Sequence, residues 1–179
     1  MDADVIALLL VRLVVGSTMV AHGVNHWVGG GKIEGTAGWF SGLGLRHGKL
    51  QAWMSVVTEI GAGVLLLVGL ATPLACAAVI AVMAVAGLLA HRKNGFFVFK
   101  DGYEYVLVLA VVALALAVFG PGRWSVDHAA DIELTGWLGG GIALGAAVVA
   151  TGGLLATFWR PERRTSSVAD PASAVEPAG

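Results

Sequence analysis

The chain has 179 residues, of which 57% are hydrophobic and only 13% are charged, and its formal net charge is −1. Soluble domains carry about 25% charged residues, so this composition leaves too little polar surface for a water-soluble globular protein. A near-neutral chain without a concentrated basic block also excludes nucleic acid as a partner. The composition therefore predicts an integral membrane protein.

Long apolar runs follow one another along the chain. Crossing about 30 Å of hydrocarbon takes around 20 helical residues, and backbone groups in lipid need the internal partners that a helix provides. Five runs meet or approach this length: Val5–Ala21, Trp53–Leu70, Pro73–Ala90, Tyr105–Phe119 (lengthened if it begins at Tyr103) and Gly136–Phe158. The predicted fold class is all-α, a polytopic membrane helical bundle with a four-helix core and a fifth C-terminal transmembrane helix.

The segments between the runs predict how the helices connect. The first connection, Gly23–Gln51, mixes glycine with aromatic residues and is typical of an interfacial or partly re-entrant segment. Ala71-Thr72-Pro73 is short enough to force an antiparallel hairpin, and Pro73 suits the first turn of a helix. Gly120-Pro121-Gly122 ends the fourth run, and the Ser-, Ala- and Pro-rich tail after Arg164 is predicted to be disordered.

Basic residues predict the orientation. If all five runs cross the membrane, nine lysines and arginines lie on one side and only Arg123 lies on the other. The nine are Lys32, Arg46, Lys49, Arg92, Lys93, Lys100, Arg160, Arg163 and Arg164. Because positive residues stay in the cytoplasm, the N-terminus is predicted outside and the C-terminus in the cytoplasm.

Two charged residues lie inside apolar runs. Arg12 is ten residues before His22, or about 15 Å deep, and Glu59 is six residues after Trp53, or about 9 Å deep from the same side. A charge in hydrocarbon costs about 3 kcal/mol, so we expect the two side chains to form an ion pair. Either a purely structural pair or one that also contacts a ligand fits the sequence.

Other polar residues gather at the same membrane side. His22, Asn25 and His26 follow the first run, His91 and Asn94 follow the third, and Tyr103 and Glu104 precede the fourth. The arrangement predicts a one-sided polar funnel for a small molecule or a lipid headgroup. His22 and His26 are four residues apart and could ligate a metal, but the helix is expected to end near Gly23 and no Glu-x-x-His pattern accompanies them, so no metal site is predicted.

Glycine pairs permit close helix approach in two of the runs. They are Gly61 and Gly63 in the second run, and Gly136/Gly140 and Gly141/Gly145 in the fifth. In the fifth run they suit either packing within the chain or a face for a homo-oligomer.

The polar residues also belong to an ordered series of motifs. The series comprises Arg12, Ala21-His22-Gly23, Lys32, Glu59-Ile60-Gly61-Ala62-Gly63, Gly69-Leu70-Ala71-Thr72-Pro73, Asn94-Gly95-Phe96-Phe97, Gly102-Tyr103-Glu104, Gly120-Pro121-Gly122, Ser125 and Asp127. In this order the motifs resemble the DoxX family of small bacterial membrane proteins, over about residues 5–128.

The resemblance implies a compact four-helix core related to the small subunit of thiosulfate:quinone oxidoreductases. Residues 1–128 would form that DoxX-like core, residues 129–159 an additional transmembrane helix with its connection, and residues 160–179 a disordered cytoplasmic tail. The predicted ligand-binding residues are Arg12, His22, Asn25, Lys32, Glu59, His91, Asn94, Tyr103 and Glu104. Glu59 is the catalytic candidate, for proton handling, and Arg12 is the expected anchor for an anion or carbonyl.

By the same resemblance, the protein is expected to be a subunit or accessory of a membrane redox or sulfur-metabolism system in the bacterial plasma membrane. Its ligand would be quinone, lipid or a small sulfur compound, and its partners membrane lipid and redox enzymes. No metal or flavin site is evident, so quinone is the one cofactor to expect, and whether the chain is itself an enzyme stays open. A non-catalytic scaffold for redox enzymes, or a small transporter or lipid handler, are the alternatives.

Overall fold

The computed structural model describes residues 3–132 and 134–160, so the predicted disordered tail lies outside the described residues except for Arg160. Its α-helices are α1 (Ala3–Val28), α2 (Lys32–Gly42), α3 (Gly48–Val68), α4 (Thr72–Ala86), α5 (Glu104–Phe119), α6 (Val126–Ala129) and α7 (Gly136–Phe158). Within these residues no strand is present, and Leu45 and Trp159 form an isolated antiparallel bridge. The all-α fold class is confirmed.

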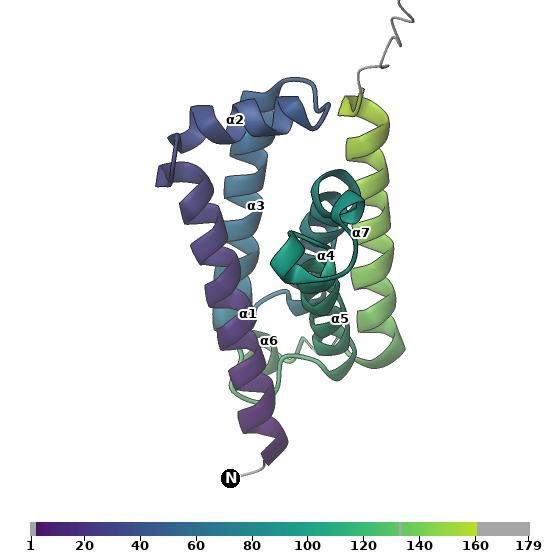
Figure 1. Cartoon of the computed structure of the whole chain (residues 1–179). Helices are drawn as coiled ribbons and strands as arrows, with labels where there is room; N and C mark the ends of the chain where they lie inside the picture. The colour runs from purple at the N-terminus through teal and green to yellow at the C-terminus, as the bar shows by residue number, and fades with distance from the viewer. Residues whose placement is uncertain (1–2, 133, 161–179) are drawn as a thin grey trace, which may run out of the picture.

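The long helices run back and forth between two ends of the molecule (Figure 1). α2 lies across the ends of α1 and α3, and α7 ends near α2, at the end opposite the N-terminus. Four helical segments are long and apolar enough to cross a membrane: Ala3–Val28, Gly48–Val68, Thr72–Asn94 and Gly136–Phe158. α5 is a shorter apolar helix. This is the architecture of a polytopic membrane bundle.

Two predicted helix boundaries are wrong. α1 continues past Ala21 to Val28, and α3 begins at Gly48 rather than Trp53. The prediction ended each apolar run at its first polar or glycine residues. In the structure the helical backbone ladder continues through them, although Gly23 and Gln51 are buried and His22 is exposed. The predicted starts of the fourth and fifth helices, near Glu104 and at Gly136, agree with the structure.

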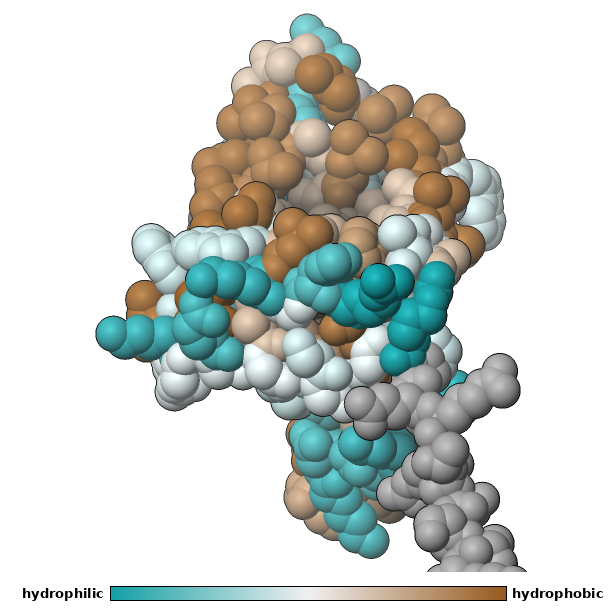
Figure 2. Space-filling view, turned by 90° about the horizontal axis from the view of Figure 1, so that it is seen from above, coloured by the Kyte–Doolittle hydropathy of each residue, from teal (hydrophilic) through white to brown (hydrophobic). Residues whose placement is uncertain are grey.

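The outer surface of the long helices is apolar. Val57, Phe119 and Val149 are 67%, 74% and 75% exposed, respectively. Figure 2, which views the α2 end, shows hydrophilic residues gathered in a band with broad apolar areas beside it. An apolar surface of this extent suits contact with lipid acyl chains rather than water.

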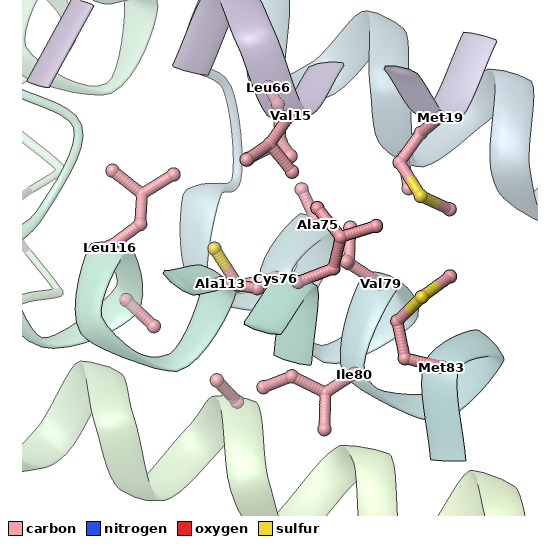
Figure 3. Packing of buried hydrophobic residues seen from close by; sticks show 14 of the residues in the cluster. Val15, Met19, Leu66, Ala75, Cys76, Val79, Ile80, Met83, Ala113 and Leu116 are labelled. Atoms are coloured by element: carbon pink, nitrogen blue, oxygen red, sulfur yellow. The ribbon is translucent and has the colours of Figure 1, made fainter. Parts of the chain in front are cut away.

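The hydrophobic core is centred on α4 (Figure 3). Cys76 and Val79 lie among residues of α1, α3 and α5, including Met19, Leu66 and Leu116. The lone Cys76 is a free and fully buried thiol, so it packs as a small hydrophobic residue.

Glycine allows α1 and α3 to touch backbone to backbone. A Cβ atom placed on Gly16 would lie 2.8 Å from the Gly63 carbonyl oxygen, and one on Gly63 would lie 2.6 Å from the Gly16 carbonyl oxygen. By contrast, Gly61 has no neighbouring atom within 4 Å of its Cβ position. The predicted close approach is therefore correct for Gly63 and wrong for Gly61.

The glycines of α7 also differ in whether a neighbouring helix lies close to them. A Cβ on Gly140 would lie 2.7 Å from Val118 of α5, whereas Gly141 and Gly145 face open space. Gly140 thus serves packing within the chain. A homo-oligomer through the open face of α7 stays a prediction.

We expect Gly63→Ala to lower the free energy of unfolding by about 1–3 kcal/mol, because the added methyl group would press on the α1 backbone. Gly61→Ala is the matched control, two residues away in the same helix, and should leave stability unchanged or raise it, since alanine favours helix by about 1 kcal/mol. Thermal unfolding of the two variants in detergent tests this, and equal destabilisation would contradict the assigned helix contact.

Candidate functional site

The two intramembrane charges do not meet. Arg12 lies level with Leu66 and Leu67 near the end of α3, seven to eight residues beyond Glu59, or about 11 Å along the helix. The predicted Arg12–Glu59 ion pair is therefore wrong. The predicted depths already differed by about 6 Å, which the long Arg12 side chain was expected to bridge. In the structure that side chain instead reaches the carbonyl end of α3, away from Glu59.

Arg12 instead binds backbone carbonyl groups from two distant segments. Nε donates to Leu66 O at 3.0 Å and Nη2 to Leu67 O at 3.2 Å. Nη1 donates to Pro121 O at 2.6 Å and to Trp124 O at 2.9 Å. Leu66 O also accepts from the backbone N–H of Gly69 at 3.2 Å. Carbonyl groups at a helix end and in a connection lack full helical pairing, so the buried guanidinium supplies donors for them.

Asp127 completes this cluster. Its Oδ1 accepts from the backbone N–H of Ala71 at 2.7 Å, and its Oδ2 accepts from that of Thr72 at 2.9 Å. A carboxylate at this place satisfies the free N–H groups at the start of α4 and carries the charge that the helix dipole favours there. The fully buried Asp127 is also the opposite charge near Arg12.

We call Arg12, Gly69, Pro121, Ser125 and Asp127 the basal joint. Gly69 has a φ of +68° and faces both Arg12 and Ser125, since a Cβ there would lie 2.8 Å from Arg12 Cζ and 2.5 Å from Ser125 Cβ. Motifs that are far apart in the sequence meet here to fix the α3–α4 and α5–α6 connections. Arg12 therefore has a structural role at this joint. It is also absent from the residues that line the cavity described below.

Glu59 lies toward the α2 end and is only 2% exposed. Ser55 Oγ donates a short hydrogen bond to Glu59 Oε1, and His26 Nε2 lies 3.7 Å from the same oxygen. The other oxygen, Oε2, has no hydrogen-bond partner. Buried polar atoms are rarely left without a partner, so this oxygen points to a ligand or a proton.

A cavity of about 800 Å³ lies between the α1–α3 pair and the α4, α5 and α7 helices. Apolar side chains form most of its lining, and α2 contributes Trp39 and Phe40. The rings of Trp39 and Phe40 lie 6.1 and 5.9 Å from that of His26. Glu59 is part of the lining, so its unpartnered oxygen belongs to a site large enough for an organic ligand.

The predicted ligand-binding residues fall into two groups. His22, Glu59 and His91 line the cavity. The other predicted residues do not: Arg12, Asn25, Lys32, Asn94, Tyr103 and Glu104. Three of the predicted side chains therefore lie at one cavity. The sequence alone did not distinguish them from polar residues that lie elsewhere.

Asn94 and Glu104 hold the turn between α4 and α5. Asn94 Nδ2 donates to Asp101 O at 3.0 Å, and Glu104 Oε2 accepts from Val98 N at 2.9 Å. His91 Nδ1 lies 2.9 Å from Asp101 O in the same turn. These hydrogen bonds give Asn94 and Glu104 a structural role in the turn that needs no ligand.

The sequence reasoning missed a polar stripe on α3. Gln51, Ser55 and Thr58 line the cavity together with Glu59. Their positions recur at three- and four-residue intervals, which places them on one helix face. For Ser55 and Thr58 this spacing within the run Trp53–Leu70 was the signal that could have found them, whereas Gln51 was assigned to the connection before that run. Thr151 of α7 and Tyr105 of α5 also line the cavity and were not predicted.

In the part of the chain that the structure describes, no group of three or more His, Cys, Asp or Glu side chains is placed to hold a metal ion. His22 and His26 do share α1, contrary to the expected helix end near Gly23. Their partners differ, however. His22 stacks on Tyr105 at 6.0 Å, whereas His26 faces Glu59.

The fold and the cavity define a polytopic helical membrane protein with a largely apolar cavity that carries one buried carboxylate. The chain belongs to the DoxX family, whose model matches residues 7–92. Comparison with the curated proteins and with the solved structures found no match. The matched region includes Arg12 and Glu59 but ends before α5 and α7, so the predicted boundaries of a core over residues 1–128 stay a prediction.

We expect Arg12→Gln to lower the free energy of unfolding by about 3 kcal/mol or more, because several buried carbonyl groups lose their donor. Lys49→Gln is the control, since its ion pair with Glu34 is exposed and should contribute less than about 1 kcal/mol. Thermal unfolding and the yield of folded protein measure both variants. A stable Arg12→Gln protein would contradict the structural role of the basal joint.

Proposed function

We propose that this DoxX-family protein binds a membrane-soluble quinone in the Glu59 cavity and serves as a subunit or accessory of a membrane redox or sulfur-metabolism system. The observation that carries the proposal is the unpartnered Oε2 of a buried carboxylate in the wall of a largely apolar cavity. A quinone ring with its tail needs an apolar pocket and a few polar contacts at its oxygen atoms.

The size and lining of the cavity support a ligand of this kind. Ligand pockets have volumes of about 300–1,000 Å³ and place few polar groups among apolar walls. The cavity of about 800 Å³ falls in this range. Two of its unpartnered polar atoms, Gln51 Nε2 and Glu59 Oε2, would donate to a carbonyl oxygen and exchange a proton with a hydroxyl group, respectively.

Access from the lipid side supports a membrane-soluble ligand. Met54 of α3 and Val149 of α7 line the cavity although they are 39% and 75% exposed. Their exposed parts belong to the apolar outer surface of the bundle. A hydrophobic molecule dissolved in the bilayer could therefore enter between α3 and α7 without crossing water.

Bound quinone would supply two-electron, two-proton redox chemistry, with electrons exchanged with a partner redox enzyme. Glu59 would hold or release a proton at Oε2. His26 lies against Oε1 of the same carboxylate, and its side chain is 20% exposed. His26 would thus link the buried carboxylate to water near α2, while Ser55 holds the carboxylate in place by its hydrogen bond.

The assignment changes the expected role of Arg12. Its side chain donates to four backbone carbonyl groups, so it is not the anchor for a ligand carbonyl. Gln51 takes that place, because its Nε2 is buried without a partner and its side chain belongs to the cavity lining.

Charge supports the proposed orientation in the bacterial plasma membrane. Lys32, Arg46 and Lys49 lie at the α2 end, and α7 ends there with Arg160. Arg123 follows α5 near the basal joint. By the positive-inside rule the α2 end is cytoplasmic, so the cavity would take up protons from the cytoplasm.

A lipid acyl chain is the second candidate occupant, because the same lateral access admits it. Native mass spectrometry of gently extracted protein separates the possibilities, since quinone, lipid and partner subunits differ in mass. Stoichiometric partner proteins with no bound small molecule would instead support the scaffold interpretation.

We expect Glu59→Gln to abolish most of the quinone-dependent oxidation of thiosulfate or a thiol, because the amide keeps the shape but cannot exchange the proton. Glu34→Gln is the matched control, since Glu34 is exposed and lies outside the cavity. The assay uses purified protein with its co-purifying partners. Unchanged activity in Glu59→Gln would remove the proton-handling role.

His26→Gln should keep quinone binding and slow turnover by about tenfold or more, because the carboxylate loses its link to water. His47→Asn is the control: His47 lies outside the cavity and has a φ of +57°, which asparagine tolerates. Binding and turnover are measured in parallel, and a His26→Gln protein with normal turnover would contradict the link.

A further inference from the structure

Buried side-chain atoms without a hydrogen-bond partner concentrate at the cavity. Among the residues that the structure describes there are four such atoms: Gln51 Nε2, Glu59 Oε2, Thr72 Oγ1 and Thr151 Oγ1. Gln51, Glu59 and Thr151 line the cavity, whereas Thr72 lies at the start of α4. Gln51 and Thr151 are 3% and 9% exposed.

The three cavity residues come from two separate walls. Gln51 and Glu59 lie on α3, whereas Thr151 lies on α7, and these helices stand on either side of the bundle in Figure 1. α7 packs against α4 and α5. A molecule that fills the cavity could therefore contact polar atoms at both ends.

The end of α7 is tied to the segment before α3. Arg46 N donates to Phe158 O at 2.9 Å, and Arg160 N donates to Gly44 O at 2.7 Å. The indole Nε1 of Trp159 donates to Leu43 O at 3.1 Å. These contacts join the top of α7 to the α2–α3 connection, so the wall that carries Thr151 is held in place relative to the wall that carries Gln51.

The free hydroxyl of Thr151 is unusual for a helix. A helical threonine commonly donates to the carbonyl group four residues earlier, and an unsatisfied buried hydroxyl costs about 1–3 kcal/mol. Thr151 Oγ1 has no such partner. Its placement at the cavity wall suggests that a ligand oxygen satisfies it.

We propose that Thr151 is a second ligand-binding residue and that the cavity recognises a ring with oxygen atoms at two opposite ends. This inference rests on the proposed quinone binding and deepens it. Glu59 binds one oxygen, and the Thr151 hydroxyl donates to the other. Because Thr151 lies beyond the matched residues 7–92, α7 becomes part of the binding site rather than an added anchor.

The test compares threonine variants of the purified full chain by calorimetric titration with decylubiquinone, which has two ring carbonyl groups. Thr151→Val keeps the shape, removes the hydroxyl and should weaken binding about fivefold, whereas Thr151→Ser should restore most of it. Ser17→Ala is the control, because it also removes a helical hydroxyl but Ser17 is exposed and lies outside the cavity, and its affinity should stay within twofold of the parent.

A second probe, 4-decylphenol, has one ring oxygen and should bind the parent and Thr151→Val equally. Ligand-free Thr151→Val should unfold at the same or a higher temperature, which separates a lost ligand contact from a folding defect. Unchanged decylubiquinone affinity in Thr151→Val would overturn this inference alone, provided that Glu59→Gln weakens binding. Absence of decylubiquinone binding by the parent protein would overturn both proposals.

Discussion

The guanidinium group of Arg12 ties together segments that are more than a hundred residues apart in the sequence. Its four bonds go to carbonyl groups at the end of α3 and in the connection after α5. Asp127, in the short α6 that follows this connection, accepts hydrogen bonds from the first N–H groups of α4. In hydrocarbon these backbone groups have no water to bind, so side chains must satisfy them. One arginine and one aspartate thereby fix where three helices end or begin.

The two ends of the helical bundle are packed differently, and the cavity lies toward the end opposite the basal joint. At the basal joint the helices converge around satisfied polar groups, and near their middle Gly16 and Gly63 bring α1 against α3. Toward α2 the α1–α3 pair separates from α4, α5 and α7, and the cavity occupies the space between them. The polar groups there differ in kind from those of the joint, because several have no partner within the chain. This contrast separates residues that hold the fold from residues available to a ligand.

The cavity also shows that the family region does not form the site alone. α1 and α3 supply His22, His26 and Glu59, all within residues 7–92. α5 and α7 supply Tyr105 and the wall around Thr151, outside that region. If the proposed ligand is correct, the matched region would bring the proton-handling group, and the C-terminal helix would shape what the pocket accepts. Variation in α7 would then change ligand preference while leaving the basal joint intact.

The sequence by itself determined the membrane class, the helical runs, the hairpin at Ala71-Thr72-Pro73 and the presence of buried charges at Arg12 and Glu59, because hydropathy and the cost of burying charge act locally along the chain. It could not determine the partners of those two charges. Which way a long side chain extends along its neighbour depends on the contacts that the other helices offer, and the carbonyl groups at the end of α3 and after α5 lie within reach of Arg12. Only the tertiary structure decided that Arg12 binds backbone carbonyl groups and that Glu59 lies beside His26 in the wall of a cavity, since both outcomes follow from helix register and packing rather than from residue type.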